Sequence, residues 1–224
     1  MLGFPETLVT GHQDFLASRF TRETARYKAL AGPGQAPDTL VIACCDSRVT
    51  PEIIFDAAPG DLFVVRNVAN LIPPCEPDGA YHATSAAIEF AVQSLKVGNI
   101  VVLGHGGCGG IRAALDTASS PLSPGDFIGK WMNLLAPAAN TVLAEPTLRD
   151  CERQTALERI SIRCSIENLR TFPCVEALER QGRLGLHGAW FDISSGAMWL
   201  MDMHTGRFEQ SISDRAKSSG KTKL

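Results

Sequence analysis

The segment Thr39-Leu-Val-Ile-Ala-Cys-Cys-Asp-Ser-Arg48 joins an apolar run to a group of chemically reactive side chains. Its first half is rich in β-branched residues and has the length of one strand. The glycines and prolines of residues 31–37 precede it and end a helical region. Because the run is apolar throughout rather than alternating, it predicts a strand buried on both faces of a sheet. The reactive residues then lie at the carboxyl end of that strand.

Two more runs, Asp61–Val65 and Asn99–Leu103, have the same apolar, β-branched character. Between them, the apolar residues of Ala80–Lys96 fall on one face at helical spacing. Strands that alternate with helices predict an α/β fold with a mostly parallel central β-sheet flanked by helices. Such a sheet is normally covered on both faces.

The second half of the chain is less regular. Residues 121–146 contain four prolines and predict loops with short helices, whereas Leu148–Leu169 predicts a long helix. Leu184–Ile193 and Ala197–Met203 flank Ser194-Ser195-Gly196, which predicts a C-terminal hairpin that extends the sheet.

These patterns suggest three parts of the chain. Residues 1–34 form an N-terminal helical arm, residues 35–212 a single α/β domain, and residues 213–224 a polar tail. No internal repeat interrupts the middle part, so we expect one domain that carries the function.

Composition excludes several classes of protein. The chain has 224 residues, 45% hydrophobic and 20% charged, with a net charge of −3, as in ordinary globular proteins. Its charges form no basic stripe, so we expect no nucleic-acid partner, and no apolar run is long enough to cross a membrane. Seven cysteines, an odd number with no repeated spacing, favour a reducing cytoplasmic location over a disulfide framework.

Two strand ends carry metal-ligand residues. Cys44 ends the first strand, and His105 and Cys108 follow the third. Ligands of open α/β sheets bind beyond the carboxyl ends of the strands, and two thiolates with one imidazole leave one position of a tetrahedral zinc free, as in catalytic sites. If the chain stays extended, Asp46 and Arg48 project on the same side as Cys44.

The glycines around His105 permit a second interpretation. Gly104 to Gly109 match the G-x-G-x-x-G fingerprint of dinucleotide-binding loops, and an acidic residue, Asp126, stands at about the expected distance. However, Asp126 lies in a proline-containing loop rather than at the end of the next strand, where the ribose-binding acid belongs. A phosphate-binding loop also has no need of His105 and Cys108.

Several motifs together resemble the β-class carbonic anhydrases. These are Gln35-Ala-Pro, Cys44-Cys-Asp-Ser-Arg48, Arg66-Asn-Val-Ala-Asn70, Ala86-Ala-Ile-Glu89 and Gly104-His-Gly-Gly-Cys-Gly-Gly110. The resemblance runs from about Gln35 to Ile111 and resumes at residues 167–169 and 186–192, leaving residues 116–163 poorly matched. The chain is similar to the plant-type members of the family. However, Val41 stands where bicarbonate-regulated members have Trp, so we expect no regulatory bicarbonate site.

The resemblance implies a lyase that hydrates CO₂ reversibly to bicarbonate and a proton on one Zn²⁺ per chain. The implied zinc ligands are Cys44, His105 and Cys108. Zinc-bound hydroxide attacks CO₂ in this family, and an Asp46–Arg48 dyad would orient the water. The implied substrate-binding residues are Gln35, the N–H of Gly109, and an apolar group of Phe63, Val68 and Tyr81.

The resemblance also leaves alternatives open. The family has a closed form in which the aspartate binds zinc, and the sequence does not choose between the two forms. A carbonyl sulfide or carbon disulfide hydrolase resembles this family in fold and zinc ligands, and a zinc-stabilised interaction protein would need no catalysis. The resemblance further implies a homodimer or a multiple of dimers, with the N-terminal helices embracing a second subunit.

Overall fold

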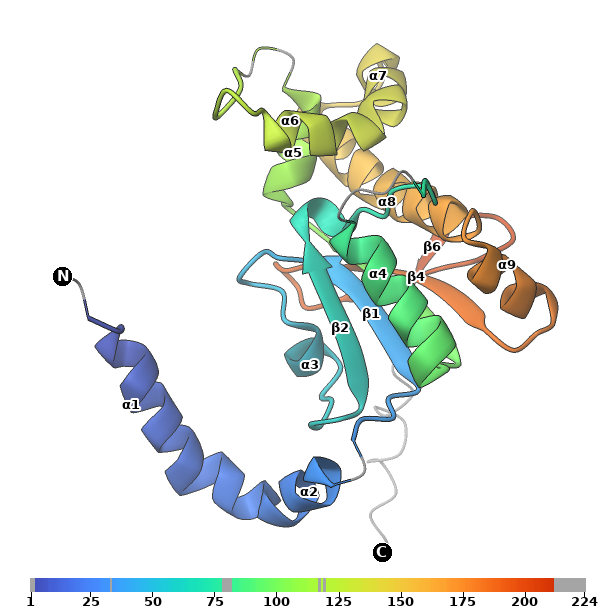
Figure 1. Cartoon of the computed structure of the whole chain (residues 1–224). Helices are drawn as coiled ribbons and strands as arrows, with labels where there is room; N and C mark the ends of the chain where they lie inside the picture. Colours follow the sequence, from blue (N-terminus) through green and yellow to red (C-terminus); the bar gives the residue numbers. More distant parts are fainter. Residues whose placement is uncertain (1–2, 33, 78–81, 117, 119, 212–224) are drawn as a thin grey trace, which may run out of the picture.

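A six-stranded sheet forms the centre of the protein, here described by a computed structural model (Figure 1). The structure describes residues 3–32, 34–77, 82–116, 118 and 120–211. The strand order is β2-β1-β3-β4-β5-β6; the first four strands are parallel and the last two antiparallel. The strands are β1 (Thr39–Cys44), β2 (Leu62–Asn67), β3 (Asn99–His105), β4 (Gly185–Phe191), β5 (Met198–Met201) and β6 (Phe208–Gln210).

The helices confirm most of the pattern predicted from the sequence. They are α1 (Glu6–Phe15), α2 (Thr21–Ala31), α3 (Pro51–Ile54), α4 (Ala83–Glu89), α5 (Gly109–Leu115), α6 (Phe127–Met132), α7 (Ala136–Ala144), α8 (Asp150–Leu169) and α9 (Pro173–Arg180). Phe90–Leu95 continues α4 as a π-helical segment and ends at a left-handed Lys96. The β4–β5 hairpin is confirmed; β6 and α9 are elements that the sequence analysis did not predict.

The two faces of the sheet are covered unequally. On one face, Leu40 and Ile100 belong to a large apolar core that includes residues of α4, α8 and α9. On the other face, Val41 and Leu103 belong to a smaller cluster, in which Ile54 of α3 is the one helical member among the described residues. The predicted, mostly parallel sheet flanked by helices is confirmed, and among the described residues one face has more helical cover than the other.

Helices α6, α7 and the first part of α8, which come from the segment that the family resemblance left unmatched, form a layer over the carboxyl ends of the strands. Residues of α6, α7 and α8 pack together with α5 in an apolar cluster. That cluster also contains Cys44 and Cys108, whose exposed fractions are 4% and 1%. The layer therefore shields the strand ends from solvent.

The N-terminal helices extend away from the sheet as an arm (Figure 1). In residues 6–31, all of which the structure describes, no side chain is buried. The arm is tied to the remainder of the chain near its end, where Arg26 donates hydrogen bonds to the carbonyl of Pro59 and the carboxylate of Asp61. Apolar side chains farther out on the arm, such as Val9 and Leu16, stay exposed.

Within the described residues, no helix combines the length and the apolar character of a membrane span. The predicted polar tail, residues 213–224, lies outside the described residues.

Close packing of α8 on β4 gives a testable consequence. A Cβ atom on Gly188 would lie 2.8 Å from Cγ2 of Ile162 and 3.0 Å from Cβ of Met201. We therefore expect Gly188→Ala to lower the free energy of unfolding by about 1–3 kcal/mol through overpacking, measured by urea denaturation.

Gly11 provides the matched control, because a Cβ atom there meets nothing within 4 Å. Gly11→Ala should be neutral or stabilise the chain by up to about 1 kcal/mol, since alanine is the better helix former. Equal stabilities of the two variants would show that α8 and β4 are not in close contact.

Candidate metal centre

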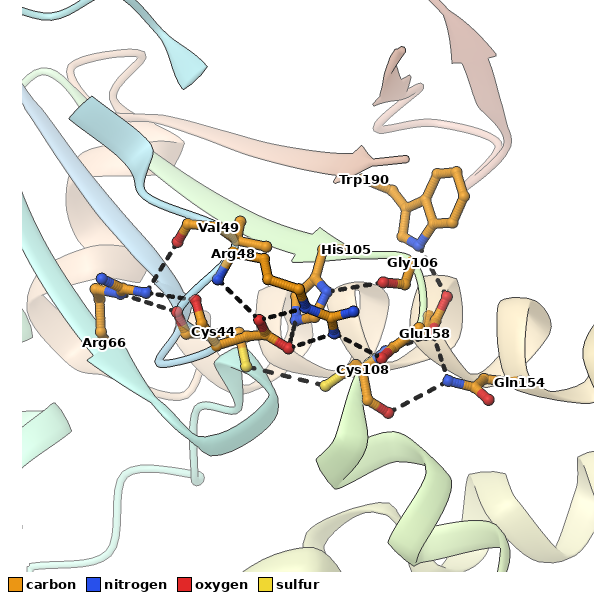
Figure 2. A network of polar contacts seen from close by, with 12 residues as sticks. Cys44, Arg48, Val49, Arg66, His105, Gly106, Cys108, Gln154, Glu158 and Trp190 are labelled. Carbon is orange, nitrogen blue, oxygen red and sulfur yellow. Dashed lines mark hydrogen bonds and ion pairs between the residues drawn. The ribbon is translucent and has the colours of Figure 1, made fainter. Parts of the chain in front are cut away.

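Parallel pairing of β1 with β3 brings the predicted metal ligands together (Figure 2). Cys44 ends β1, His105 ends β3, and Cys108 precedes α5. The Sγ atoms of Cys44 and Cys108 are 3.9 Å apart, and all three donor atoms lie within 4.8 Å of one another. In the described part of the chain this is the one group of three or more potential metal ligands that lie so close together.

The donor set fits a zinc ion. Two thiolates bound tetrahedrally at a Zn–S distance of about 2.3 Å would be separated by about 3.8 Å, close to the separation found here. Nδ1 of His105 donates a hydrogen bond to the carbonyl oxygen of Gly106 at 3.0 Å, because that oxygen can only accept. Nε2 of His105 is buried and has no hydrogen-bond partner among the described residues, so this nitrogen is available to bind a metal.

The two thiols cannot both ionise in isolation. Hydrogen bonding from the Cys108 thiol lowers the pKa of Cys44 to about 4, against the opposing effect of burial. The same contact, together with burial, raises the pKa of Cys108 above its ordinary value. A divalent cation removes this conflict, since it stabilises both thiolates at once.

Asp46 and Arg48 form a bidentate pair beside this cluster. Nε and Nη2 of Arg48 donate to Oδ1 and Oδ2 of Asp46 at 2.9 and 2.7 Å, and the backbone N–H of Arg48 also donates to Oδ1. These hydrogen bonds hold the pKa of Asp46 well below its usual range. Oδ2 of Asp46 lies 3.9 Å from Nε2 of His105, so the ionised carboxylate borders the site.

The pairing arises differently from the sequence expectation. β1 ends at Cys44, and residues 46–49 form a turn in which the Val49 N–H donates to the carbonyl of Asp46. The turn, rather than an extended chain, folds Arg48 back onto Asp46. Arg48 also donates to the carbonyl of Gly107 at 3.2 Å, which links this turn to the loop that carries Cys108.

Arg66 supports the same turn, a role that the sequence analysis did not assign. Its guanidinium donates to the carbonyl oxygens of Cys44, Asp46 and Val49 at 2.9, 2.7 and 2.9 Å (Figure 2). Arg66 comes from β2, which pairs with β1. Its place within the motif Arg66–Asn70 was the one sequence feature that could have indicated a role.

The predicted substrate-binding residues do not all lie near the cluster. Val68 and Trp131 line an apolar cavity of about 580 Å³. Gly109 begins α5, directly after Cys108, and a Cβ atom there would meet nothing within 4 Å. Tyr81 lies outside the described residues.

Gln35 and Phe63 lie at the other end of the strands. Gln35 is exposed four residues before β1, and Phe63 pairs with Leu40 in the amino-terminal half of β2. A six-residue strand is roughly 17 Å long, so one chain does not bring these residues to its own cluster. Phe90, which the sequence analysis did not single out, is 46% exposed and packs on Phe63 with ring centroids 5.9 Å apart.

Together, a mostly parallel α/β sheet and a buried Cys₂His group at its carboxyl end define a metalloprotein with a site of the catalytic zinc type. A sequence model described as "Carbonic anhydrase" matches residues 39–198. The chain therefore belongs to the carbonic anhydrase family, and its relatives place it in the β class, whose members are zinc enzymes that hydrate CO₂ reversibly.

Individual relatives agree with this assignment. A carbonic anhydrase of Pseudomonas aeruginosa is 37% identical over 90% of this chain and 89% of its own length. The mitochondrial β-carbonic anhydrase 6 of Arabidopsis thaliana is 34% identical over 90% of this chain and 69% of its own length. Among solved structures, the β-carbonic anhydrase CcaA superposes with a TM-score of 0.85 at 30% identity, covering 93% of this chain and 92% of that chain.

These comparisons give no support to the alternatives. The matches described above are carbonic anhydrases, and none of them is named a carbonyl sulfide hydrolase or a dinucleotide-binding protein. The structure also places His105 and Cys108, the variable positions of the glycine-rich fingerprint, in the metal-ligand group.

Proposed function

We propose that Cys44, His105 and Cys108 hold the zinc of this carbonic anhydrase and that Asp46 and Arg48 act beside it in CO₂ hydration. The observation that carries the proposal is the convergence of three buried donor atoms within 4.8 Å, with the Asp46 carboxylate at their border. When bound, zinc lowers the pKa of water toward neutrality and so supplies the nucleophile.

We assign to the Asp46 carboxylate the role of accepting a hydrogen bond from the water or hydroxyl group at the site and so orienting it. Because Arg48 keeps it ionised, with a pKa well below the usual range, Asp46 can only accept hydrogen bonds. It therefore accepts from a hydroxyl and repels a bare anionic oxygen at the same position. Asp46 is not part of the metal-ligand group, and its bidentate pairing with Arg48 supports the open form, in which the fourth metal position is left to water and substrate.

The surroundings suit a small nonpolar substrate. Val68, which lines the apolar cavity together with Trp131, follows Asn67, which pairs with Cys44, and packs against the cluster that contains Cys44 and Cys108. CO₂ needs little more than an apolar surface and an N–H donor for its oxygens, and we assign the donor role to the N–H of Gly109, the first residue of α5.

Stopped-flow CO₂ hydration by the zinc-loaded protein tests this proposal. Asp46→Asn and Arg48→Ala should each retain one zinc per chain and lose at least about tenfold in kcat/KM, since loss of the orienting hydrogen bond misplaces the reacting group, which can cost on the order of 10²-fold. Zinc content is measured on the same samples.

Loss of metal from either variant would instead indicate a structural role for the pair. No CO₂ hydration by the zinc-loaded wild-type chain would overturn the proposal itself. Relative turnover of carbonyl sulfide and carbon disulfide, measured in parallel, checks the choice of CO₂ as substrate.

We also propose that residues 35–212 form the catalytic domain and that residues 1–34 are an arm that binds a second copy of the chain. Three observations support a homodimer or a multiple of dimers: the helices of the arm have no buried side chain, one sheet face has little helical cover, and Phe63 and Phe90 form an aromatic pair far from the chain's own site. Two tetrameric β-carbonic anhydrases of Sordaria macrospora show that such assemblies occur among similar folds; the matching chain has a TM-score of 0.74 and 29% identity, covering 91% of this chain and 98% of that chain.

In such a dimer, Gln35 and Phe63 of one chain would complete the substrate pocket of the other. We further infer a cytoplasmic location for this assembly, since all seven cysteines are free thiols, as is usual in a reducing compartment.

Charged residues on the apolar face of the arm test the dimer. Val9 and Leu16, both 43% exposed, are seven residues apart and share one helix face. We expect Val9→Glu/Leu16→Glu to shift the sedimentation coefficient to that of a smaller assembly and to lower kcat/KM, because the partner's pocket residues are lost.

Gly11→Glu adds a charge on the opposite face of α1 and serves as the control, with unchanged sedimentation expected. Equal sedimentation of both variants and the wild type would contradict a role of this face in assembly.

A further inference from the structure

Glu158 is a buried carboxylate directly behind the metal centre, and the mechanism above does not use it. It lies in the middle of α8 and is 2% exposed. Among the described residues no cation lies within ion-pair distance of it. A buried charge is costly unless hydrogen bonds replace its hydration, so the contacts of Glu158 indicate what its burial achieves.

All the hydrogen bonds of the carboxylate within the described residues come from N–H donors (Figure 2). Oε1 accepts from the backbone N–H of Cys108 and from Nε2 of Gln154, both at 3.0 Å, and Oε2 accepts from Nε1 of Trp190 at 3.1 Å. Burial raises the pKa of Glu158, and these three bonds oppose the rise. Three N–H donors therefore surround the carboxyl group, and one of its oxygen atoms accepts each of these hydrogen bonds.

The same network also binds the backbone carbonyl group of Cys108. Nε2 of Gln154 also donates to the carbonyl oxygen of Cys108 at 3.3 Å. Both backbone polar groups of this residue are therefore engaged by side chains of a single helix, α8. Gln154 and Glu158 are four residues apart and lie on the same face of that helix.

The loop that carries Cys108 needs such external support. It contains two consecutive glycines, and Gly107 has a left-handed φ of 67°. Trp190 covers the first of them, since a Cβ atom on Gly106 would lie 3.1 Å from its ring. A flexible loop would hold the Cys108 thiolate in several positions, which would weaken binding of a metal that requires one.

We propose that Glu158, held by Trp190 and Gln154, is a positioning residue that fixes Cys108 for metal binding. The inference rests on the proposed zinc site and adds to it the residue that places one ligand. It predicts that the bond from the Cys108 N–H to Glu158, rather than the general stability of α8, sets the affinity for the metal.

Glu158→Gln tests the proposal with little change of shape. Its amide group brings a donor against one of the existing N–H groups, so we expect metal affinity to fall by about 10- to 100-fold, the usual effect of removing such a supporting partner. Dissociation constants for Zn²⁺ and Co²⁺ are measured by chelator competition, and the thiolate-to-metal charge-transfer absorption of the Co²⁺ protein reports the geometry at sulfur.

Gln154→Met provides a second, milder variant in case Glu158→Gln does not fold. It removes the bonds to the Cys108 carbonyl and to Oε1 of Glu158, so a smaller loss of affinity in the same direction is expected. Ile166→Val is the matched control, because Ile166 is buried in the large core at the opposite end of α8. It should lower the free energy of unfolding and leave the Co²⁺ spectrum and both dissociation constants unchanged.

The outcomes separate the positioning role from the zinc site itself. Wild-type affinity and an unchanged Co²⁺ spectrum in Glu158→Gln or Gln154→Met would overturn the positioning role. Equal losses of affinity in Ile166→Val would assign the effect to the stability of α8 and also overturn it. Failure of the zinc site would be recognised by a wild-type protein that binds no stoichiometric zinc, or by Cys108→Ser binding it equally well.

Discussion

Two buried thiols 3.9 Å apart impose the constraint on which the site depends. Neither the core nor the helical layer above the strands can hold two thiolates at this distance without a compensating positive charge. The neighbouring imidazole bonds to the Gly106 carbonyl through Nδ1, and its buried Nε2 has no partner among the described residues. A divalent cation would stabilise both thiolates at once, whereas the protein atoms alone stabilise one of them through the hydrogen bond between the two sulfurs.

Charged side chains outside the ligand group hold its two loops in place. Arg66 binds three carbonyl oxygens of the segment that carries Cys44, and Glu158 accepts the amide of Cys108. The Arg66 guanidinium thus donates to acceptors on one loop, and the Glu158 carboxyl group accepts from a donor on the other. Arg48 joins the two loops, because it binds both Asp46 and the carbonyl of Gly107.

The sequence predicted the parts of this arrangement that depend on strand ends. Cys44 and His105 terminate apolar runs, so their meeting follows from the pairing of parallel strands. The sequence analysis placed Arg48 on the side of Cys44 by assuming an extended chain. In the structure, the turn after β1 brings Arg48 there instead. Glu158 lies 50 residues beyond Cys108 in a segment without a recognised motif, and its role depends on how α8 crosses the sheet. No local pattern encodes that contact.

The direction of the strands also separates Gln35 and Phe63 from the metal-ligand group of the same chain. Parallel strands place all their carboxyl ends, and hence the metal ligands, at one edge of the sheet. Gln35 and Phe63 stand at the amino-terminal ends of β1 and β2, so no loop movement within the chain would join them to Cys44. In the dimer proposed above, a second copy in the opposite orientation would bring them there. The proposed dimer would account for three features at once: the exposed Phe90, the sheet face with little helical cover, and the exposed apolar residues of the arm.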